Sequence, residues 1–182
     1  IEFLIKQFAK QKKITMVDYL FENYFDKLPE SLQNKKFKSE QLADLMVAIG
    51  RTAPDFSWEN NGKKMALSSL QDAENYILVF WSTGCSHCLN EIPKLHTFLK
   101  DKSNIKVVAF SLEKNDFKWN KMKGDLPNWH HVLGLNKWEN KIARTYNINA
   151  TPTYFVLDKN KKIIAKPNEF EDVKAYIQNL KM

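Results

Sequence analysis

Apolar side chains recur at helical spacing throughout residues 1–49, a segment that contains no glycine and no cysteine. Side chains three and four positions apart share one face of an α-helix, so each such stripe predicts an amphipathic helix. We expect three helices, the second ending before Pro29 and the third opened by Ser39 and capped by Gly50. The stripes are Ile1, Leu4, Ile5 and Phe8; Ile14, Val17, Phe21, Tyr24, Phe25 and Leu28; and Leu42, Leu45, Met46 and Ile49.

This segment is interpreted as a helical unit that packs on a neighbouring domain, with Thr15 and Asp18 capping its second helix. A docking surface, or the end of an upstream domain, is the alternative interpretation. The chain starts without methionine, and its first apolar stretch, residues 1–5, is too short for a signal peptide. We therefore expect a mature or trimmed chain.

From residue 50 onward the pattern alternates between strands and helices, which predicts a second domain, residues 50–182, of the α/β class with a partly parallel sheet. The continuous apolar run at residues 76–81 is typical of a strand buried on both faces. The other predicted strands are 105–110, 153–157 and 162–165, and the predicted helices are 85–100, 137–146 and 169–180. An excursion rich in tryptophan and lysine, residues 116–134, lies between the two halves.

Composition narrows the classes of protein. The 182 residues are 43% hydrophobic and 13% aromatic, with a mean hydropathy of -0.49 and no long uncharged apolar run, so we expect a folded domain and no membrane span. The net charge is +7, but the lysines are scattered, and we expect no nucleic-acid partner. Only two cysteines are present, which excludes a disulfide framework.

Those two cysteines, Cys85 and Cys88, lie where the buried strand turns into a helix. A sulfur at a helix N-terminus meets unpaired backbone N–H groups and the positive end of the helix dipole, which stabilise a thiolate. Cys85 is therefore the candidate nucleophile. Cys88, one helical turn further and more shielded, is the candidate resolving cysteine. His87 between them can add a positive charge or a hydrogen bond that favours the ionised sulfur.

Glu91 follows Cys88 by three residues and shares its helical face. A carboxylate there can accept or return the proton of Cys88, although the same residue fits a solvated helix position. Pro93 is expected to bend the helix beneath the site.

The spacing C-x-x-C also serves haem and metals, and the neighbouring residues decide among these uses. Haem attachment needs a histidine after the second cysteine, where Leu89 stands. Structural zinc needs four ligands, and a zinc site would have to recruit His130 and His131. The strand before the pair and the helix after it favour redox chemistry without a cofactor or metal.

Thr151 and Pro152 stand between a predicted helix and a predicted strand. An X-Pro bond in this place is a candidate cis peptide, although composition alone would leave it trans. A cis bond would turn the Thr151 backbone toward the cysteines and offer hydrogen bonds to an incoming peptide.

Residues 50–182 resemble the thioredoxin superfamily, and within it the TlpA/ResA-like and AhpC-related branch. The resemblance rests on Ala53-Pro54-Asp55-Phe56, Phe80-Trp81 leading to Cys85 and Cys88, Glu91 with Pro93, and Thr151-Pro152. It implies a thioredoxin fold, a central mixed sheet flanked by helices, with a strand-helix insertion between its halves and, here, a helical segment in front.

The resemblance also implies an activity. It implies a thiol-disulfide oxidoreductase with Cys85 attacking, Cys88 resolving, Glu91 tuning and a cis Pro152 facing the disulfide. The implied partners are protein thiols or disulfides and an upstream redox partner, in the periplasm or cell envelope of a bacterium of the Bacteroidetes type. The expected substrate-binding residues are Trp81, Gly84, His87, Thr151 and Pro152.

Two positions depart from the thioredoxin pattern. Gly84 replaces the tryptophan before the first cysteine, and Val79 replaces a buried aspartate on the preceding strand. His87 matches the second intervening residue of strongly oxidising DsbA-like proteins, which leaves the direction of electron flow open.

Two other functions compete. A peroxidase is suggested by the Ala-Pro-Asp-Phe start, but of the proline and threonine that peroxiredoxins place before a lone cysteine only Thr83 is nearby. A non-catalytic binder would hold copper through the cysteines and a histidine, or a partner through residues 1–49. A group of aromatic residues in and after the excursion is interpreted as structural, with a partner-binding rim as the alternative. Its members are Trp119, Trp129, Trp138, His130 and His131.

Overall fold

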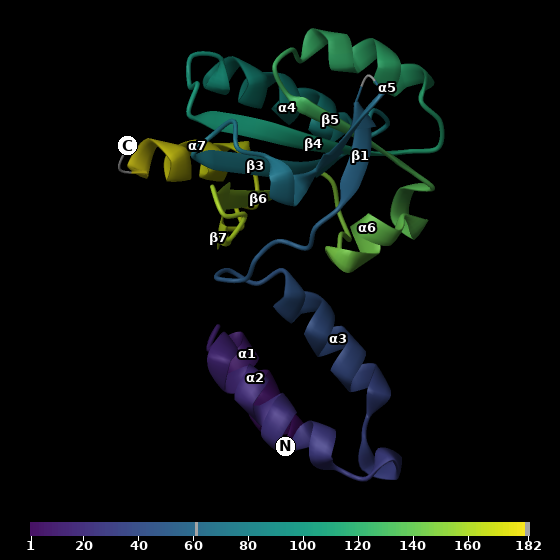
Figure 1. Ribbon diagram of the computed structural model, residues 1–182, viewed down its shortest axis with the longest axis vertical. Helices are drawn as coiled ribbons and strands as arrows, with labels where there is room; N and C mark the ends of the chain where they lie inside the picture. The colour runs from purple at the N-terminus through teal and green to yellow at the C-terminus, as the bar shows by residue number, and fades with distance from the viewer. Residues whose placement is uncertain (61, 181–182) are drawn as a thin grey trace.

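The computed structural model describes residues 1–60 and 62–180 (Figure 1). A five-stranded sheet forms its centre, in the order β5-β4-β3-β6-β7. Strands β3, β4 and β5 are parallel, whereas β6 and β7 run antiparallel to their neighbours. The expected mixed α/β sheet is confirmed. The strands are β3 Asn75–Trp81, β4 Ile105–Glu113, β5 His130–Leu135, β6 Thr153–Asp158 and β7 Ile163–Ala165.

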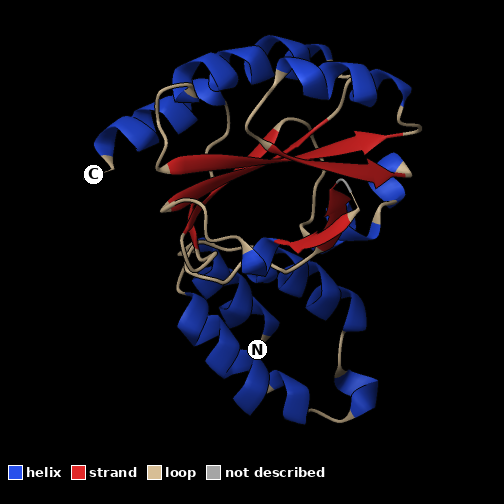
Figure 2. Ribbon diagram, turned by 45° about the horizontal axis from the view of Figure 1, so that its top comes forward, coloured by secondary structure: helices blue, strands red, loops and turns tan. Residues whose placement is uncertain are grey.

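Helices cover one face of this sheet, and a hairpin with a short helix covers the other (Figure 2). Successive residues of a strand point to opposite faces, so the apolar run of β3 serves both cores. Ile77, Val79 and Trp81 pack toward α4, α5 and α7, whereas Tyr76, Leu78 and Phe80 pack toward the hairpin and α6. The bounds are α4 Ser86–Leu99, α5 Phe117–Met122, α6 Lys141–Thr145, α7 Phe170–Asn179, and for the hairpin β1 Ser57–Asn60 and β2 Lys63–Ala66.

The excursion contains α5 and then β5, which adds a strand to the edge of the sheet beside β4. The single helix predicted over 137–146 is wrong. A 3-10 turn, Lys137–Glu139, comes first, and Asn140 then starts α6 by accepting hydrogen bonds from the N–H groups of Ile142 and Ala143. A side-chain cap at this position begins a new helix and so interrupts the continuous pattern.

The three predicted helices are present and share an apolar core: α1 Glu2–Lys10, α2 Ile14–Asn23 and α3 Lys35–Met46. Several boundaries differ from the prediction. Helix α2 has no side-chain cap, and Asp18 pairs instead with Arg51. Helix α3 begins four residues before Ser39, because Asn34 Oδ1 accepts the N–H of Phe37. Gly50 lies beyond the end of α3.

The predicted stripes are also wider than the buried faces. Leu4, Tyr24, Met46 and Ile49 are exposed, whereas Ile5, Val17, Phe21 and Leu45 form the core with Leu20, Phe25 and Phe37. Because three short helices enclose a small core, only part of each apolar stripe finds a partner.

The chain that leaves α3 runs along the outer edge of β7. The N–H of Gly50 donates to the carbonyl of Ile163 at 2.7 Å, and the N–H of Ile163 donates to the carbonyl of Arg51 at 2.7 Å. Thr52 and Lys162 form an antiparallel bridge. These contacts attach the helical unit to the sheet.

No helix within residues 1–60 and 62–180 combines the length and the apolarity that crossing a bilayer requires.

Candidate active site

Cys85 is the N-cap residue of α4, at the carboxyl end of the central strand β3. Its sulfur accepts the N–H of Cys88 at 3.1 Å, and its own N–H donates to the carbonyl of Ser82 at 3.1 Å. Gly84, which is exposed, leads into the helix with its N–H on Ser82 Oγ at 3.2 Å. The predicted position of Cys85 at the helix start is confirmed, and its half-buried sulfur borders a cavity of about 110 Å³.

The environment of Cys85 favours the thiolate. Burial acts against ionisation, but hydrogen bonds from the side chains of Cys88 and Thr151 and from the backbone of Cys88 and His87 outweigh it. Together these contacts hold the pKa of Cys85 below its usual value.

Cys88 lies one turn further and is completely buried in the core between the sheet and α4. Burial, followed by the neighbouring Cys85 sulfur, raises the pKa of Cys88 to about 12. Both cysteines are free thiols. The pair therefore combines an accessible sulfur that ionises readily with a shielded sulfur that stays protonated.

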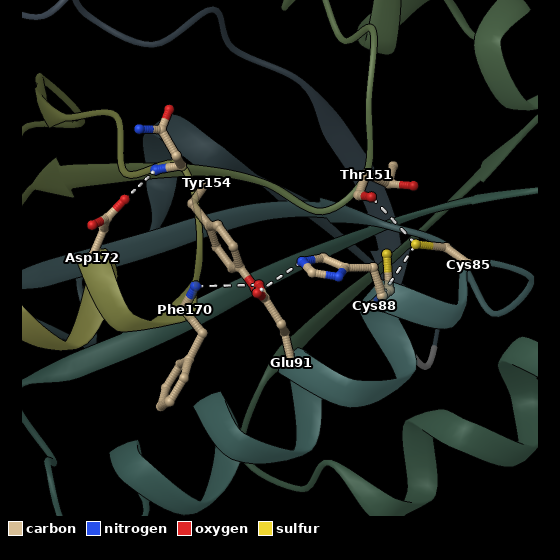
Figure 3. A network of polar contacts seen from close by, with 9 residues as sticks. Cys85, Cys88, Glu91, Thr151, Tyr154, Phe170 and Asp172 are labelled. Atoms are coloured by element: carbon tan, nitrogen blue, oxygen red, sulfur yellow. Dashed lines mark hydrogen bonds and ion pairs between the residues drawn. The ribbon is translucent and has the colours of Figure 1, made fainter.

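Thr151, in the loop before β6, faces the pair and is followed by Pro152. The peptide bond between them is cis. The Cys85 thiol donates to the Thr151 carbonyl at 3.3 Å (Figure 3). The Pro152 side chain is buried. The structure thus brings residues 66 positions apart in the chain into direct contact.

Glu91 is buried, and its carboxylate accepts two hydrogen bonds and lies at ion-pair distance from one histidine (Figure 3). Oε2 receives the Tyr154 hydroxyl at 2.8 Å and the N–H of Phe170 at 3.2 Å, and Oε1 contacts His87 Nε2 at 3.0 Å. Glu91 thereby connects α4 to β6 and α7. Burial, and then the hydrogen bond to Glu91, raises the pKa of Tyr154 above its usual value.

Two predicted contacts are placed differently from expectation. The His87 imidazole meets Glu91, so the help that His87 gives to the Cys85 sulfur comes from its backbone and not from its ring. Trp81 is fully buried in the core that also holds Cys88, and it has no surface to offer a substrate.

Glu113 is a buried carboxylate that sequence reasoning did not single out. It ends β4, beyond the predicted strand end at residue 110, and accepts the N–H of Thr83 at 2.6 Å, the Thr83 hydroxyl at 2.9 Å and the Ser111 hydroxyl at 2.7 Å. Since Thr83 is two residues before Cys85, Glu113 fixes the loop that presents the nucleophile. A lone acidic residue after an apolar run carries no signal of this role.

The aromatic residues of the excursion do not form one group. Trp129 packs between His96 and His131, with ring centroids 5.6 and 6.4 Å away, and His130 pairs with Asp72 at 2.8 Å. Trp138 instead lines the cavity beside Cys85.

Within the described part of the chain, no three His, Cys, Asp or Glu side chains are grouped so that they could hold a metal ion.

Comparison with known proteins adds relatives of several kinds. The Redoxin family model matches residues 48–180. The thioredoxin-like protein YneN of Bacillus subtilis (strain 168) is 32% identical over 129 residues, which cover 68% of this chain and 73% of that protein. The thiol-disulfide oxidoreductase ResA of Geobacillus thermodenitrificans (strain NG80-2) is 26% identical over 146 residues, covering 74% of this chain and 79% of the relative.

Two solved structures are similar as well. A domain of a possible thiol-disulfide isomerase from Cytophaga hutchinsonii ATCC 33406 is 33% identical with a TM-score of 0.61, covering 71% of this chain and 90% of that one. A thioredoxin-like protein from Bacteroides caccae ATCC 43185 has a TM-score of 0.69 at 20% identity. That match covers 85% of this chain but only 58% of the longer protein, and it supports the fold alone.

Proposed function

This chain belongs to the Redoxin family and is a thioredoxin-like thiol-disulfide oxidoreductase, and we propose that it exchanges disulfides with protein substrates through Cys85 and Cys88. The observation that carries the proposal is the unequal environment of the two free thiols. Cys85 caps α4 with a lowered pKa at the surface, whereas Cys88 is fully buried with a pKa raised to about 12. Formation of a mixed disulfide needs a thiolate that can attack, and its resolution needs a second sulfur close to the first.

When the pair reduces a substrate, the Cys85 thiolate attacks one sulfur of the substrate disulfide. The other substrate sulfur leaves as a thiolate and takes up a proton. Cys88 then gives up its proton and attacks Cys85, which releases the second substrate thiol and leaves a Cys85–Cys88 disulfide. Two electrons pass to the substrate, and a dithiol redox partner upstream returns them. The same steps in reverse oxidise a substrate dithiol.

We propose that Glu91 tunes the step in which Cys88 loses its proton. The carboxylate is buried one helical turn beyond Cys88, and the Tyr154 hydroxyl that donates to it also responds to the charge of both sulfurs. Glu91→Gln keeps the shape and removes the charge, so the pH dependence of mixed-disulfide resolution should shift. An unchanged pH profile would assign Glu91 a structural role only.

The substrate surface is proposed to consist of Gly84, His87, Thr151 and Pro152. Gly84 and His87 are exposed beside Cys85, and the Thr151 carbonyl already meets the sulfur at 3.3 Å. A substrate strand next to Thr151 would donate a backbone hydrogen bond to the Thr151 carbonyl, in place of the one from the Cys85 thiol. Pro152 is buried, so it acts by holding this loop in place.

We also propose a domain organisation and a cellular location for this protein. Residues 1–49 are proposed to be a helical unit and residues 50–182 the thioredoxin-like domain, which the separate apolar core of α1–α3 supports. The resemblance to TlpA- and ResA-like proteins supports work in the periplasm or cell envelope of a bacterium. Fractionation of cells that produce the full-length protein tests this location, and recovery in the cytoplasm would contradict it.

Substrate trapping tests the function. In the full chain, Cys88→Ser should leave the mixed disulfide unresolved, so that Cys85 stays bound to substrate proteins or to a disulfide peptide. Cys85→Ser should lose exchange with insulin or with the peptide. If Cys85→Ser keeps the wild-type exchange rate, Cys85 is not the nucleophile, and rapid peroxide consumption without exchange would indicate a peroxidase instead.

A further inference from the structure

Two hollows adjoin Gly84, the residue before Cys85, and both have Gly84 and Lys137 in their linings. The first, of about 110 Å³, is bounded by Cys85, Thr151 and Trp138. The second, of about 380 Å³, continues past Gly84 toward the start of α5. We call the side chains that surround them the lysine rim, which consists of Lys114, Phe117, Lys118, Lys137 and Trp138.

The accessible charge of the lysine rim is positive. Lys114, Lys118 and Lys137 line the second hollow together with a single acidic residue, Glu113. Glu113 is buried, and both of its oxygens are already occupied by Thr83 and Ser111 donors. Among residues 1–60 and 62–180, none of the three lysines takes part in an ion pair. Their positive charge is therefore available to a partner.

The backbone holds Lys137 over the approach to the nucleophile. Asn136 and Lys137 both have left-handed conformations, with φ of 68° and 46°, which residues other than glycine rarely adopt. The turn is fixed because Asn140 Nδ2 donates to the Leu135 carbonyl at 2.9 Å. A Cβ placed on Gly84 would lie 3.9 Å from Lys137 Nζ, so this ammonium group sits directly beside the residue before Cys85.

The lysine rim also presents aromatic surface. Trp138, which is 47% exposed, lines the first hollow, and Phe117, which is 81% exposed, lines the second. Exposed aromatic side chains next to unpaired cations are typical of a surface that becomes covered when a polypeptide binds.

Accepting the proposed exchange through Cys85, we propose that the lysine rim selects protein substrates whose reactive cysteine is flanked by acidic residues. The three ammonium groups attract an acidic segment and steer it to the first hollow, where its sulfur meets Cys85. The aromatic side chains then cover its apolar atoms. Such steering acts mainly on the association rate and weakens as salt screens the charges.

The test uses the full-length reduced protein and two peptides, each with one cysteine in a disulfide with 2-mercaptoethanol. The cysteine is flanked by aspartate and glutamate in one peptide and by lysine in the other. Bis(2-hydroxyethyl) disulfide, which has no charge, reports the intrinsic reactivity of Cys85 in each variant. We expect the wild type to react on the order of tenfold faster with the acidic peptide at low salt. The ratio should approach one in about 0.5 M salt, because the Debye length is then on the order of a few ångströms and the charges are screened.

Two triple variants locate the preference. One replaces Lys114, Lys118 and Lys137 of the lysine rim by glutamine and should bring the acidic-to-basic rate ratio close to one. The other replaces Lys63, Lys64 and Lys94, which are exposed on β2 and α4, and changes the net charge equally. This control should keep the wild-type ratio.

Each remaining outcome is decisive. The inference is overturned if the wild type reacts equally with both peptides at low salt, or if the control lowers the ratio as much as the rim variant does. The latter result would assign the preference to net charge alone. If no disulfide reacts, including the uncharged one, the proposed exchange through Cys85 fails first, and the inference fails with it.

Discussion

Cys85 and Cys88 are one helical turn apart but differ in both exposure and acidity. The pKa of Cys85 is below its usual value, and that of Cys88 is raised to about 12. A lower pKa leaves more thiolate at neutral pH, and only the thiolate reacts with alkylating agents. Lowering the pH protonates Cys85 and removes this reactivity, whereas Cys88, with its raised pKa, stays protonated throughout.

Iodoacetamide alkylation of the reduced protein at pH 7 should therefore modify one cysteine, and peptide mass spectrometry should identify it as Cys85. The rate should rise with pH to a midpoint below that of an ordinary thiol. Cys88→Ser serves as the control and should react at a similar rate. Equal modification of both cysteines at pH 7 would contradict the different environments of the two sulfurs.

Glu113 gives a second prediction for a single residue. Its carboxylate accepts three short hydrogen bonds in a buried place, and a neutral amide cannot accept all three. Glu113→Gln should therefore lower the free energy of unfolding by about 1–3 kcal/mol. Because the Thr83 loop leads to Cys85, the pH dependence of Cys85 alkylation should change as well.

Urea unfolding and the alkylation assay measure both effects of Glu113→Gln. The matched control is Glu59→Gln, an exposed position on β1, which should stay within about 0.5 kcal/mol of the wild type. If Glu113→Gln is as stable as this control, Glu113 does not fix the loop.

The sequence pattern predicted individual residues of the site where the signal was local. The order Cys-Ser-His-Cys after an apolar strand placed Cys85 at a helix N-terminus, because capping depends on adjacent residues. The direction of His87 and the hydrogen bonds of Glu113 were not predictable in this way. His87 turns to Glu91 four residues along the same helix, but Glu91 is held there by Tyr154 and Phe170. Glu113 bonds to Thr83, which is 30 residues away.

At the scale of elements, the sequence pattern and the structure differ on where helix α3 begins. The sequence pattern favours Ser39 as the residue that opens the helix, whereas in the structure Asn34 accepts the N–H of Phe37 at 3.0 Å. Ser39 lies inside α3, and its hydroxyl donates to the Lys36 carbonyl at 2.9 Å.

Asn34→Ala should therefore lower the free energy of unfolding by about 0.5–2 kcal/mol, because it removes an N-cap acceptor. Ser39→Ala should have little effect, since alanine is a better helix former than serine. Thermal unfolding followed by circular dichroism compares the two variants. The reverse order of stability would restore the shorter helix that the sequence predicted.

The larger elements of residues 50–182 were predictable because each has a strong pattern of its own. The run 76–81 is apolar at every position, as a strand needs when it serves two cores. The stripes of residues 1–49 were less reliable. A stripe shows which residues share a face, but not how much of that face a neighbour covers, and Leu4 and Tyr24 remain exposed.

At the scale of the whole molecule, two polar side-chain contacts join the helical unit to the rest of the chain among the described residues. Arg51 pairs with Asp18 of α2, and Asn147 donates to Asp44 of α3 at 2.8 Å. The side chains of Arg51 and Asp18 are 35% and 33% exposed, so water screens part of their attraction.

A double-mutant cycle of Asp18→Asn and Arg51→Gln should give a coupling free energy of about 0.2–1 kcal/mol, and less in high salt. Urea unfolding of the four proteins measures it. The exposed pair Lys36 and Glu40, within α3 alone, is the control, and its coupling should be no larger. A coupling above the predicted range would show a stronger junction than these two contacts provide.

The residues that join the two parts have another consequence, which concerns self-association. A strand at the margin of a sheet offers unpaired backbone groups to any other chain, and fibrils grow from such margins. Along β7 those groups already bond to Gly50 and Arg51 of the same molecule. A foreign polypeptide would have to displace residues 50 and 51 before it could pair with β7. The protein's own chain therefore blocks fibril growth from this side of the sheet.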